Sequence, residues 1–167
     1  MELILLDISK KIDPFTLKVL SRIKAIADSR NVEFFIVGAT VRDMILNYVY
    51  NISIYRATND IDFAVRVKSW DEYYLLTDEV EKTGFRKDNY IPHRYYCEGI
   101  IIDFIPFGDI SGKNTFITWE NKEKKEMNII GFEDAFNNAE EILVQTNPDI
   151  IIRTASVESL VMLKLFS

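Results

Sequence analysis

The sequence predicts an α/β protein in which helices pack on a mixed β-sheet. Stretches with apolar residues at helical spacing alternate with short apolar or alternating runs that are typical of strands. The 167 residues are 48% hydrophobic, and no repeat or Pro/Gly-rich linker divides them. We therefore expect a single domain over residues 1–167. Residues 156–167 would begin a C-terminal helical region that is either minimal or cut short.

The composition limits the partners and the compartment. A net charge of −6 argues against a general nucleic-acid coat protein, which would be basic, although it leaves local RNA contact open. Cys97 is the single cysteine, so neither an internal disulfide nor a cysteine-based zinc site is expected. The N-terminus lacks a signal-peptide pattern, and no apolar run is as long as a membrane span. We expect a cytoplasmic protein with no membrane partner.

The first helix is predicted from Pro14, with Asp13 as its N-cap. Apolar residues recur at helical spacing from Phe15 to Ala27, and most of the basic residues fall elsewhere, where they face solvent or contact RNA.

A strand, a tight turn and a helix start are predicted next. The apolar run 34–37 is typical of a buried strand, and Gly38 after it is free to take a positive φ. Thr40 can cap the following helix, whose apolar residues again recur at helical spacing. Backbone N–H groups and the positive end of the helix dipole would then point at one spot, which suits a phosphate.

Two acids follow on a predicted strand at 60–67. Polar and apolar residues largely alternate there, which places Asp60 and Asp62 on one face, roughly 7 Å apart. Two like charges so close favour a hard divalent cation with oxygen ligands between them. The alternative is a solvated strand edge.

A helix over 70–83 ends before Gly84, and a β-hairpin with strands at 93–97 and 100–106 follows it. Asp103 is the one acid in the second of these strands. A lone buried carboxylate is costly, so Asp103 is exposed, paired or bound to a cation. If its strand lies beside that of Asp60, it becomes the third carboxylate of one cluster. The alternative is a structural salt bridge to Arg94 or Arg66.

The rest of the chain predicts a polar loop at 108–128 and a short helix at 132–139. Two strands at 142–144 and 150–152 follow, and a last helix begins at Ser156, which caps it.

The residues Gly38-Ala39-Thr40, Arg42-Asp43 and Thr58-x-Asp60-x-Asp62 resemble the nucleotidyltransferase superfamily with the DNA polymerase β fold. The stretches VGATVRDMIL and TNDIDFAV are similar to tRNA CCA-adding and poly(A) polymerases. The closer match, over nearly the whole chain, is to the AbiEii-type nucleotidyltransferases of bacterial toxin–antitoxin and abortive-infection systems. One departure is Ala39, where the polymerase-like members carry a second glycine, which leaves the tightness of the phosphate turn open.

The resemblance implies an enzyme that transfers a nucleoside monophosphate from an NTP such as ATP to an acceptor hydroxyl. The acceptor would be RNA or tRNA, and a cognate antitoxin would be a partner. Two Mg²⁺ ions, with Mn²⁺ as a substitute, would be held by Asp60, Asp62 and Asp103. Gly38 and the two residues after it would cradle the β- and γ-phosphates. The nucleotide- and phosphate-binding candidates are Gly38, Ala39, Thr40, Arg42, Asp43, Arg56, Arg94 and Lys164.

Several assignments keep an alternative. Arg56 lies in a predicted loop beside the acids, where it contacts the triphosphate or is simply solvated. Lys164 matches a lysine of a later AbiEii-type motif, but a lysine on a terminal helix is also ordinary. His93 touches a phosphate together with Arg94 or is a hydrogen-bonded structural residue. The whole chain could instead be an inactive binding or regulatory module, or a transferase acting on an antibiotic or a protein.

Overall fold

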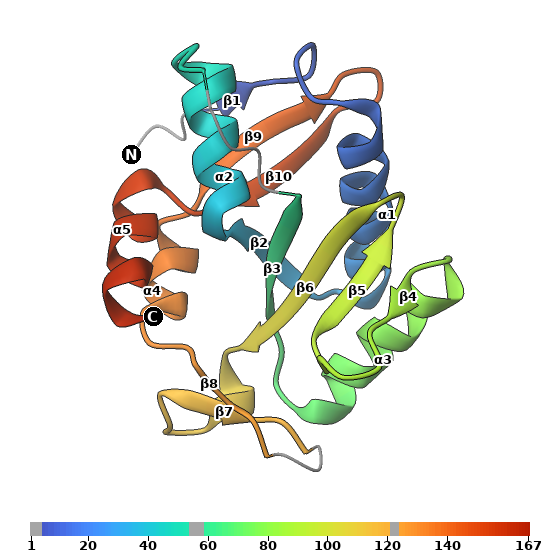
Figure 1. The fold of residues 1–167 in the computed structure, drawn as a ribbon, viewed down its shortest axis with the longest axis vertical. Coiled ribbons are helices and arrows are strands. Elements are labelled where there is room, and N and C mark those ends of the chain that lie inside the picture. Colours follow the sequence, from blue (N-terminus) through green and yellow to red (C-terminus); the bar gives the residue numbers. More distant parts are fainter. Residues whose placement is uncertain (1–4, 54–58, 121–123) are drawn as a thin grey trace.

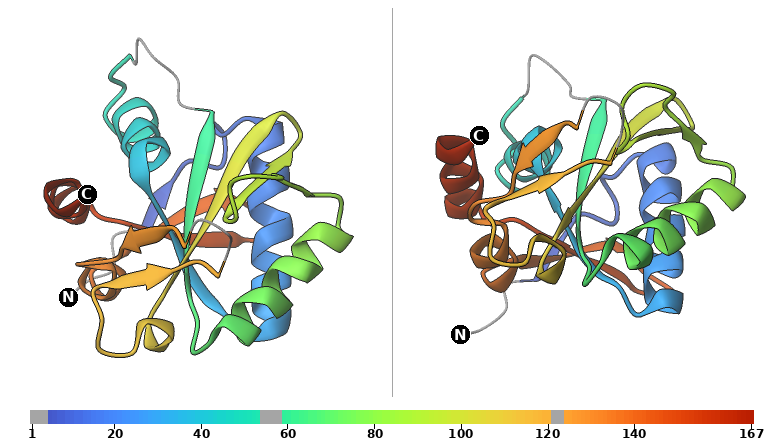
Figure 2. Two further views of the ribbon diagram at one scale, coloured as in Figure 1. Left: turned by 60° about the horizontal axis from the view of Figure 1, so that its bottom comes forward. Right: turned by 90° about the horizontal axis from the view of Figure 1, so that it is seen from below.

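The computed structural model describes residues 5–53, 59–120 and 124–167. An eight-stranded mixed sheet with strand order β1-β9-β10-β2-β3-β6-β5-β4 crosses the molecule, and β7 and β8 form a separate small sheet (Figure 1). The two views of Figure 2 show α1 and α3 side by side on one side of the large sheet, and α2, α4 and α5 on the other.

The strands are β1 (Leu5–Asp7), β2 (Glu33–Val37), β3 (Asp60–Arg66), β4 (Arg86–Lys87), β5 (Arg94–Cys97), β6 (Ile100–Phe107), β7 (Phe116–Thr118), β8 (Glu126–Asn128), β9 (Glu140–Gln145) and β10 (Ile150–Thr154). The helices are α1 (Pro14–Arg30), α2 (Gly38–Met44), α3 (Trp70–Lys82), α4 (Phe132–Asn137) and α5 (Val157–Phe166). A π-helical turn, η1 (Ile45–Val49), continues α2, and a 3₁₀ turn, η2 (Asp109–Ser111), follows β6.

The predicted start of α1 is confirmed. The Asp13 carboxylate accepts hydrogen bonds from the backbone N–H groups of Phe15 and Thr16, at 3.1 and 2.9 Å, and Pro14 occupies the first turn. The helix ends at Asn31, whose φ of 54° is left-handed. The Ser156 cap of α5 is also confirmed, because its hydroxyl accepts from the N–H of Ser159 at 3.2 Å.

The predicted Thr40 cap is wrong. The helix begins two residues earlier, at Gly38, and Val37 at the N-cap position offers no side-chain hydrogen bond. Thr40 therefore lies inside the first turn, where its hydroxyl donates to the backbone carbonyl of Asp60. The hydroxyl ties the helix to β3 instead of closing the end of the helix.

Three regions carry strands that sequence patterns did not indicate, and one of them is the two-residue strand β4. The stretch predicted as a polar loop at 108–128 contains η2 and the antiparallel pair β7–β8. Residues 1–13 were assigned no element, yet β1 pairs in parallel with β9 at the edge of the sheet. In contrast, the predicted hairpins β5–β6 and β9–β10 are both present and antiparallel.

The centre of the sheet is packed with aromatic side chains. Phe63 on β3 and Phe104 on β6 are fully buried opposite each other, and their rings stack with centroids 5.6 Å apart. Because side chains alternate along a strand, residues 62 and 103 project from the other face. A close-packed aromatic layer thus supports this face from behind.

Candidate active site

The carboxylates of three acids gather on one face of the sheet. Strands β3 and β6 are parallel neighbours, and their register places Asp62 directly beside Asp103 and Asp60 beside Ile101. Neighbouring strands are about 4.8 Å apart, and Asp60 and Asp62 share a face of β3. The expectation that the two acid-bearing strands are adjacent is therefore confirmed.

Asp103 is held by an arginine from the next strand. Arg94 on β5 lies directly opposite Asp103, and its guanidinium donates from Nε to Oδ1 at 2.8 Å and from Nη2 to Oδ2 at 2.7 Å. Of the two salt-bridge partners that the sequence suggested, Arg94 is thus the one found. Arg66 instead pairs with Glu33 and Glu133. The ion pair raises the pKa of Arg94 above its already high value.

Asp62 differs from Asp103 in having no partner for its carboxylate among the described residues. In the described part of the chain no hydrogen bond or ion pair reaches its carboxylate. Burial, followed by the charges of Asp103 and Asp60, raises the pKa of Asp62 to about 7, and Arg94 offsets this only in part. A carboxylate in this position is therefore favourable mainly when a cation lies beside it.

Gly38 provides the space that Asp62 occupies. Its φ is +80°, and a Cβ atom at this position would collide with the Asp62 carboxylate. The backbone at the start of α2 thus packs directly on the acid. The positive end of the continuous helical segment α2–η1, which begins at Gly38, therefore lies next to the Asp62 carboxylate.

An apolar groove of about 1140 Å³ adjoins this face. It brings together four of the predicted phosphate-binding residues, Gly38, Ala39, Arg42 and Lys164, from α2 and α5. Ile105 also lines it, and since Ile105 lies two residues beyond Asp103 on β6, the groove continues from the acidic face.

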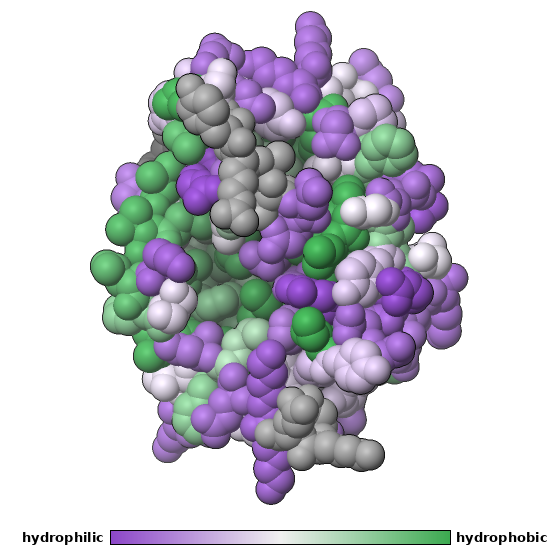
Figure 3. All heavy atoms as spheres, in the orientation of Figure 1, coloured by the Kyte–Doolittle hydropathy of each residue, from purple (hydrophilic) through white to green (hydrophobic). Residues whose placement is uncertain are grey.

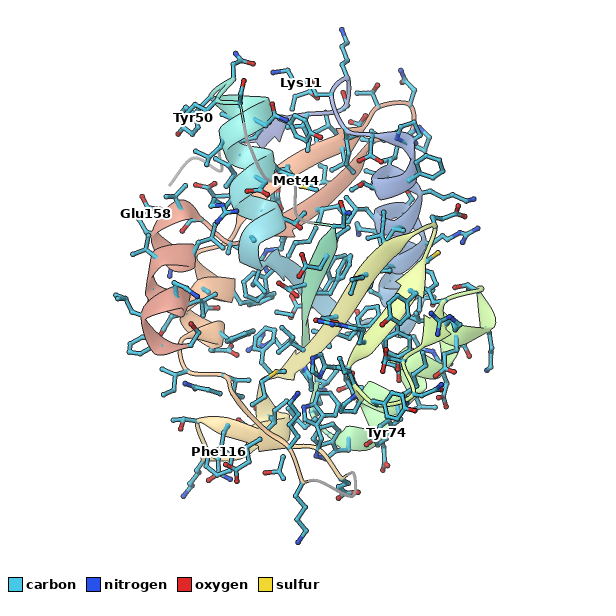
Figure 4. All side chains as sticks on the ribbon, in the orientation of Figure 1. Lys11, Met44, Tyr50, Tyr74, Phe116 and Glu158 are labelled. Atoms are coloured by element: carbon cyan, nitrogen blue, oxygen red, sulfur yellow. The ribbon has the colours of Figure 1, made fainter. Side chains whose placement is uncertain are left out.

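The side of the molecule that carries α5 is strongly apolar, as Figure 3 shows. Val161 and Leu165, 58% and 78% exposed, lie on it together with the half-exposed Val157 and Phe166. Tyr50, just after η1, and Glu158 on α5 also line the groove and are labelled in Figure 4.

The other predicted residues are distributed around this centre. Arg42 is 55% exposed and pairs with its neighbour Asp43, with Nη2 at 2.7 Å from Oδ1. Asp43 and Thr40 line a separate pocket of about 390 Å³ on the other side of α2. Arg56, together with Thr58 of the motif, lies outside the described residues.

His93 lies close to Asp103. Its Nε2 is 3.9 Å from Asp103 Oδ2, its ring packs against Trp119, and its Nδ1 has no hydrogen-bond partner in the described ranges. Burial lowers the pKa of His93, so the ring is favoured in its neutral form. Sequence reasoning did not single out Trp119, because it lies in the stretch that was predicted to be polar.

The three carboxylates have the right chemistry for a hard cation, but their positions do not surround one ion. Carboxylate oxygens are the ligands that Mg²⁺ prefers, and Asp62 offers an unpaired carboxylate. Among the described residues, however, no three acidic, histidine or cysteine side chains are placed to surround one ion. Asp103 is the limiting residue, since Arg94 engages both of its oxygens.

Comparison of the sequence with protein-family models and with curated proteins gave no match. None of the helices in the described ranges combines the length and apolar character that crossing a membrane requires.

Two solved structures share the fold, and a third is similar only in part. The solution structure of the antibiotic-resistance factor ANT(2'')-Ia matches with a TM-score of 0.51 and 16% identity, over 90% of this chain and 70% of that one. A crystal structure of ANT(2'')-Ia in complex with adenylyl-2''-tobramycin matches with a TM-score of 0.50 and 19% identity, over 90% and 75%. The complex of a CCA-adding enzyme with ATP has a TM-score of 0.43 and 20% sequence identity, over 58% of this chain and 22% of that one. The predicted fold is confirmed: the chain has the mixed sheet and flanking helices of the polymerase β-like nucleotidyltransferases.

Proposed function

We propose that the protein is a metal-dependent nucleotidyltransferase that moves a nucleoside monophosphate from an NTP, such as ATP, to an acceptor hydroxyl. One observation carries the proposal. Within a nucleotidyltransferase fold, Asp60, Asp62 and Asp103 share one face of two neighbouring strands, and the Gly38 helix start packs on the central acid. Carboxylates on one face favour oxygen-ligated cations, and nucleotide transfer uses such cations to stabilise the entering and leaving oxygens.

The acids have separate tasks in this proposal. Asp60 and Asp62 hold the cations, and Asp103 completes one site and accepts the proton of the attacking hydroxyl. Two Mg²⁺ ions, or Mn²⁺ in their place, would supply the positive charge that stabilises the entering and leaving oxygens. No covalent intermediate on the protein is needed, because the acceptor hydroxyl attacks the α-phosphorus directly and pyrophosphate leaves.

The start of α2 would bind the β- and γ-phosphates. The backbone N–H groups of Gly38, Ala39 and Thr40 are the donors, while the Thr40 hydroxyl is already engaged with the Asp60 carbonyl and holds the helix in place. Arg42 and Lys164 reach the triphosphate from the groove.

Three further residues complete the proposed nucleotide site. Asp43 orients Arg42 through their ion pair. The Arg94 guanidinium is bonded to Asp103, and it contributes a fork that matches phosphate oxygens. Arg56 is proposed as a phosphate contact from the sequence alone.

The acceptor is proposed to be RNA, and tRNA in particular, in a toxin that a cognate antitoxin restrains. This part rests on the AbiEii-type resemblance of the sequence. With a net charge of −6, RNA contact would be local and would depend on a few cations beside the site, such as Arg42 and Lys164.

A second candidate is transfer to a small hydroxyl compound. The likeness in fold to ANT(2'')-Ia, whose crystal structure holds an adenylylated tobramycin, favours it. A third candidate is an inactive nucleotide-binding module, which the Arg94–Asp103 pair favours because both oxygens of the third acid are engaged.

Label transfer separates these functions. The protein is incubated with each α-labelled NTP and Mg²⁺, together with total RNA, a protein extract or a panel of aminoglycosides. Label on RNA supports the proposed acceptor, and label only on a small compound supports the second candidate. No label in any mixture, although calorimetry detects NTP binding, would leave the inactive module. Asp62→Asn is the negative control in every mixture.

A further inference from the structure

We propose that Arg94 is the counter-ion of Asp103 in the metal-free protein and that a divalent cation displaces it. This inference rests on the metal site proposed above and goes beyond it by assigning a step that precedes nucleotide transfer. Arg94 acts through Asp103 here, and it is therefore a positioning residue for the metal site.

The geometry makes Arg94 and a cation compete for the open side of the Asp103 carboxylate. The guanidinium takes both carboxylate oxygens, at 2.8 and 2.7 Å. A metal ion binds carboxylate oxygens at about 2 to 2.6 Å, in the position where the guanidinium now lies. A cation that binds on this side of the carboxylate therefore displaces at least one hydrogen bond to Arg94.

The two partners differ in their freedom to move. The Asp103 side chain is 9% exposed and lies on β6, which has neighbouring strands on both sides. The Arg94 side chain is 27% exposed and lies on β5, whose outer neighbour is the two-residue strand β4. The arginine can turn toward solvent or a bound triphosphate, whereas the aspartate cannot leave the sheet.

The charges explain why the arginine stays until a metal arrives. Three carboxylates share this face, and in the described ranges Arg94 is the one arginine or lysine that pairs with Asp103. Without it, Asp103 would be a buried anion beside Asp62 with no counter-ion, which is strongly unfavourable. A divalent cation supplies more charge to the same place, and the released guanidinium becomes available to phosphate oxygens.

Metal binding to variants of Arg94 tests the exchange without any nucleotide. Mn²⁺ affinity is measured by electron paramagnetic resonance, and thermal midpoints are recorded in EDTA and in Mn²⁺. Arg94→Gln removes the competing cation, so its Mn²⁺ affinity should be at least tenfold tighter, its midpoint in EDTA lower, and its gain in midpoint on adding Mn²⁺ larger. Arg30→Gln, which breaks a surface pair with Glu79, should bind Mn²⁺ as the wild type does. A folded Arg94→Gln variant with unchanged or weaker Mn²⁺ affinity overturns the exchange.

A measurement on the wild type covers the case in which Arg94→Gln fails to fold. The Nε–H proton signal of Arg94 is identified by its absence from the spectrum of Arg94→Lys, which keeps the charge. It should shift or broaden as Mg²⁺ is added. A signal that stays unchanged while calorimetry shows Mg²⁺ saturating the protein overturns the proposal, and so does a wild type that binds no Mg²⁺.

The two proposals fail in different ways. Metal exchange with no transfer of label from any NTP would reject the proposed function alone. Transfer of label by a protein whose Arg94 signal ignores Mg²⁺ would reject the exchange alone.

Discussion

Replacing Asp62 by asparagine should stabilise the metal-free protein and abolish nucleotide transfer. Asparagine keeps the size of the side chain but removes the negative charge that Asp103 and Asp60 oppose. The pKa of Asp62 rises from 3.8 to about 7 in the folded protein. A shift of this size corresponds to at most about 4 kcal/mol of lost stability at alkaline pH, and to about 2 kcal/mol once partial exposure and screening are allowed for.

The sign follows from proton binding. Because the folded protein holds this proton more tightly than the unfolded chain, stability falls as pH rises from about 4 to about 7 and stays low above that. The wild type and Asp62→Asn should therefore have similar thermal midpoints at pH 4. At pH 8 the thermal midpoint of the variant should be higher by about 4 to 8 °C, since 1 kcal/mol of stability shifts the midpoint of a domain of this size by about 2 to 4 °C.

The assay is calorimetry in EDTA at several pH values, paired with transfer of labelled nucleotide in Mg²⁺. Asp28→Asn, at an exposed acid that pairs with Lys24 on α1, is the matched control and should change neither result. A variant midpoint at pH 8 below that of the wild type would mean that Asp62 has a structural partner. Retained transfer in the same variant would refute the catalytic assignment.

Three further substitutions test the local structure of the site and its surroundings. Gly38→Ala should destabilise the protein by about 1–3 kcal/mol and weaken NTP binding by calorimetry, because its Cβ collides with Asp62 at a positive φ; wild-type affinity would argue against the phosphate cradle. Thr40→Val should lower the free energy of unfolding, measured in urea, by about 1–2 kcal/mol, because the Asp60 carbonyl loses its hydrogen-bond donor. Thr40→Ser keeps the donor and should not; equal losses in the two variants would mean that side-chain packing, and not the hydrogen bond, is responsible. Asp13→Ala should cost about 1 kcal/mol in the same assay and leave transfer unchanged, because it removes only a helix cap; lost transfer would connect α1 to the site.

Local patterns predicted much of the acidic face. The alternation around Asp60 and Asp62 predicted their common face, and the cost of burying a lone carboxylate indicated that Asp103 is exposed, paired or bound to a cation. Both arguments depend on periods of two residues and on burial, which a single sequence displays directly.

What the sequence did not reveal depends on contacts between distant segments. Thr40 has the chemistry of a helix cap, but the carbonyl that its hydroxyl reaches belongs to β3. The leading interpretation of Asp103 was a metal ligand, and only the β5–β6 register places Arg94 opposite it. The groove beside Ile105 depends on where α5 packs, which no local pattern encodes.

The contact between Gly38 and Asp62 also constrains how this sequence can change over generations. A side chain at position 38 would occupy the same space as the Asp62 carboxylate, and the φ of +80° would strain it even with a smaller residue at position 62. Two separate penalties therefore oppose replacement of this glycine, and only one of them is removed when the acid is lost. We expect related sequences that keep the acid to keep the glycine as well.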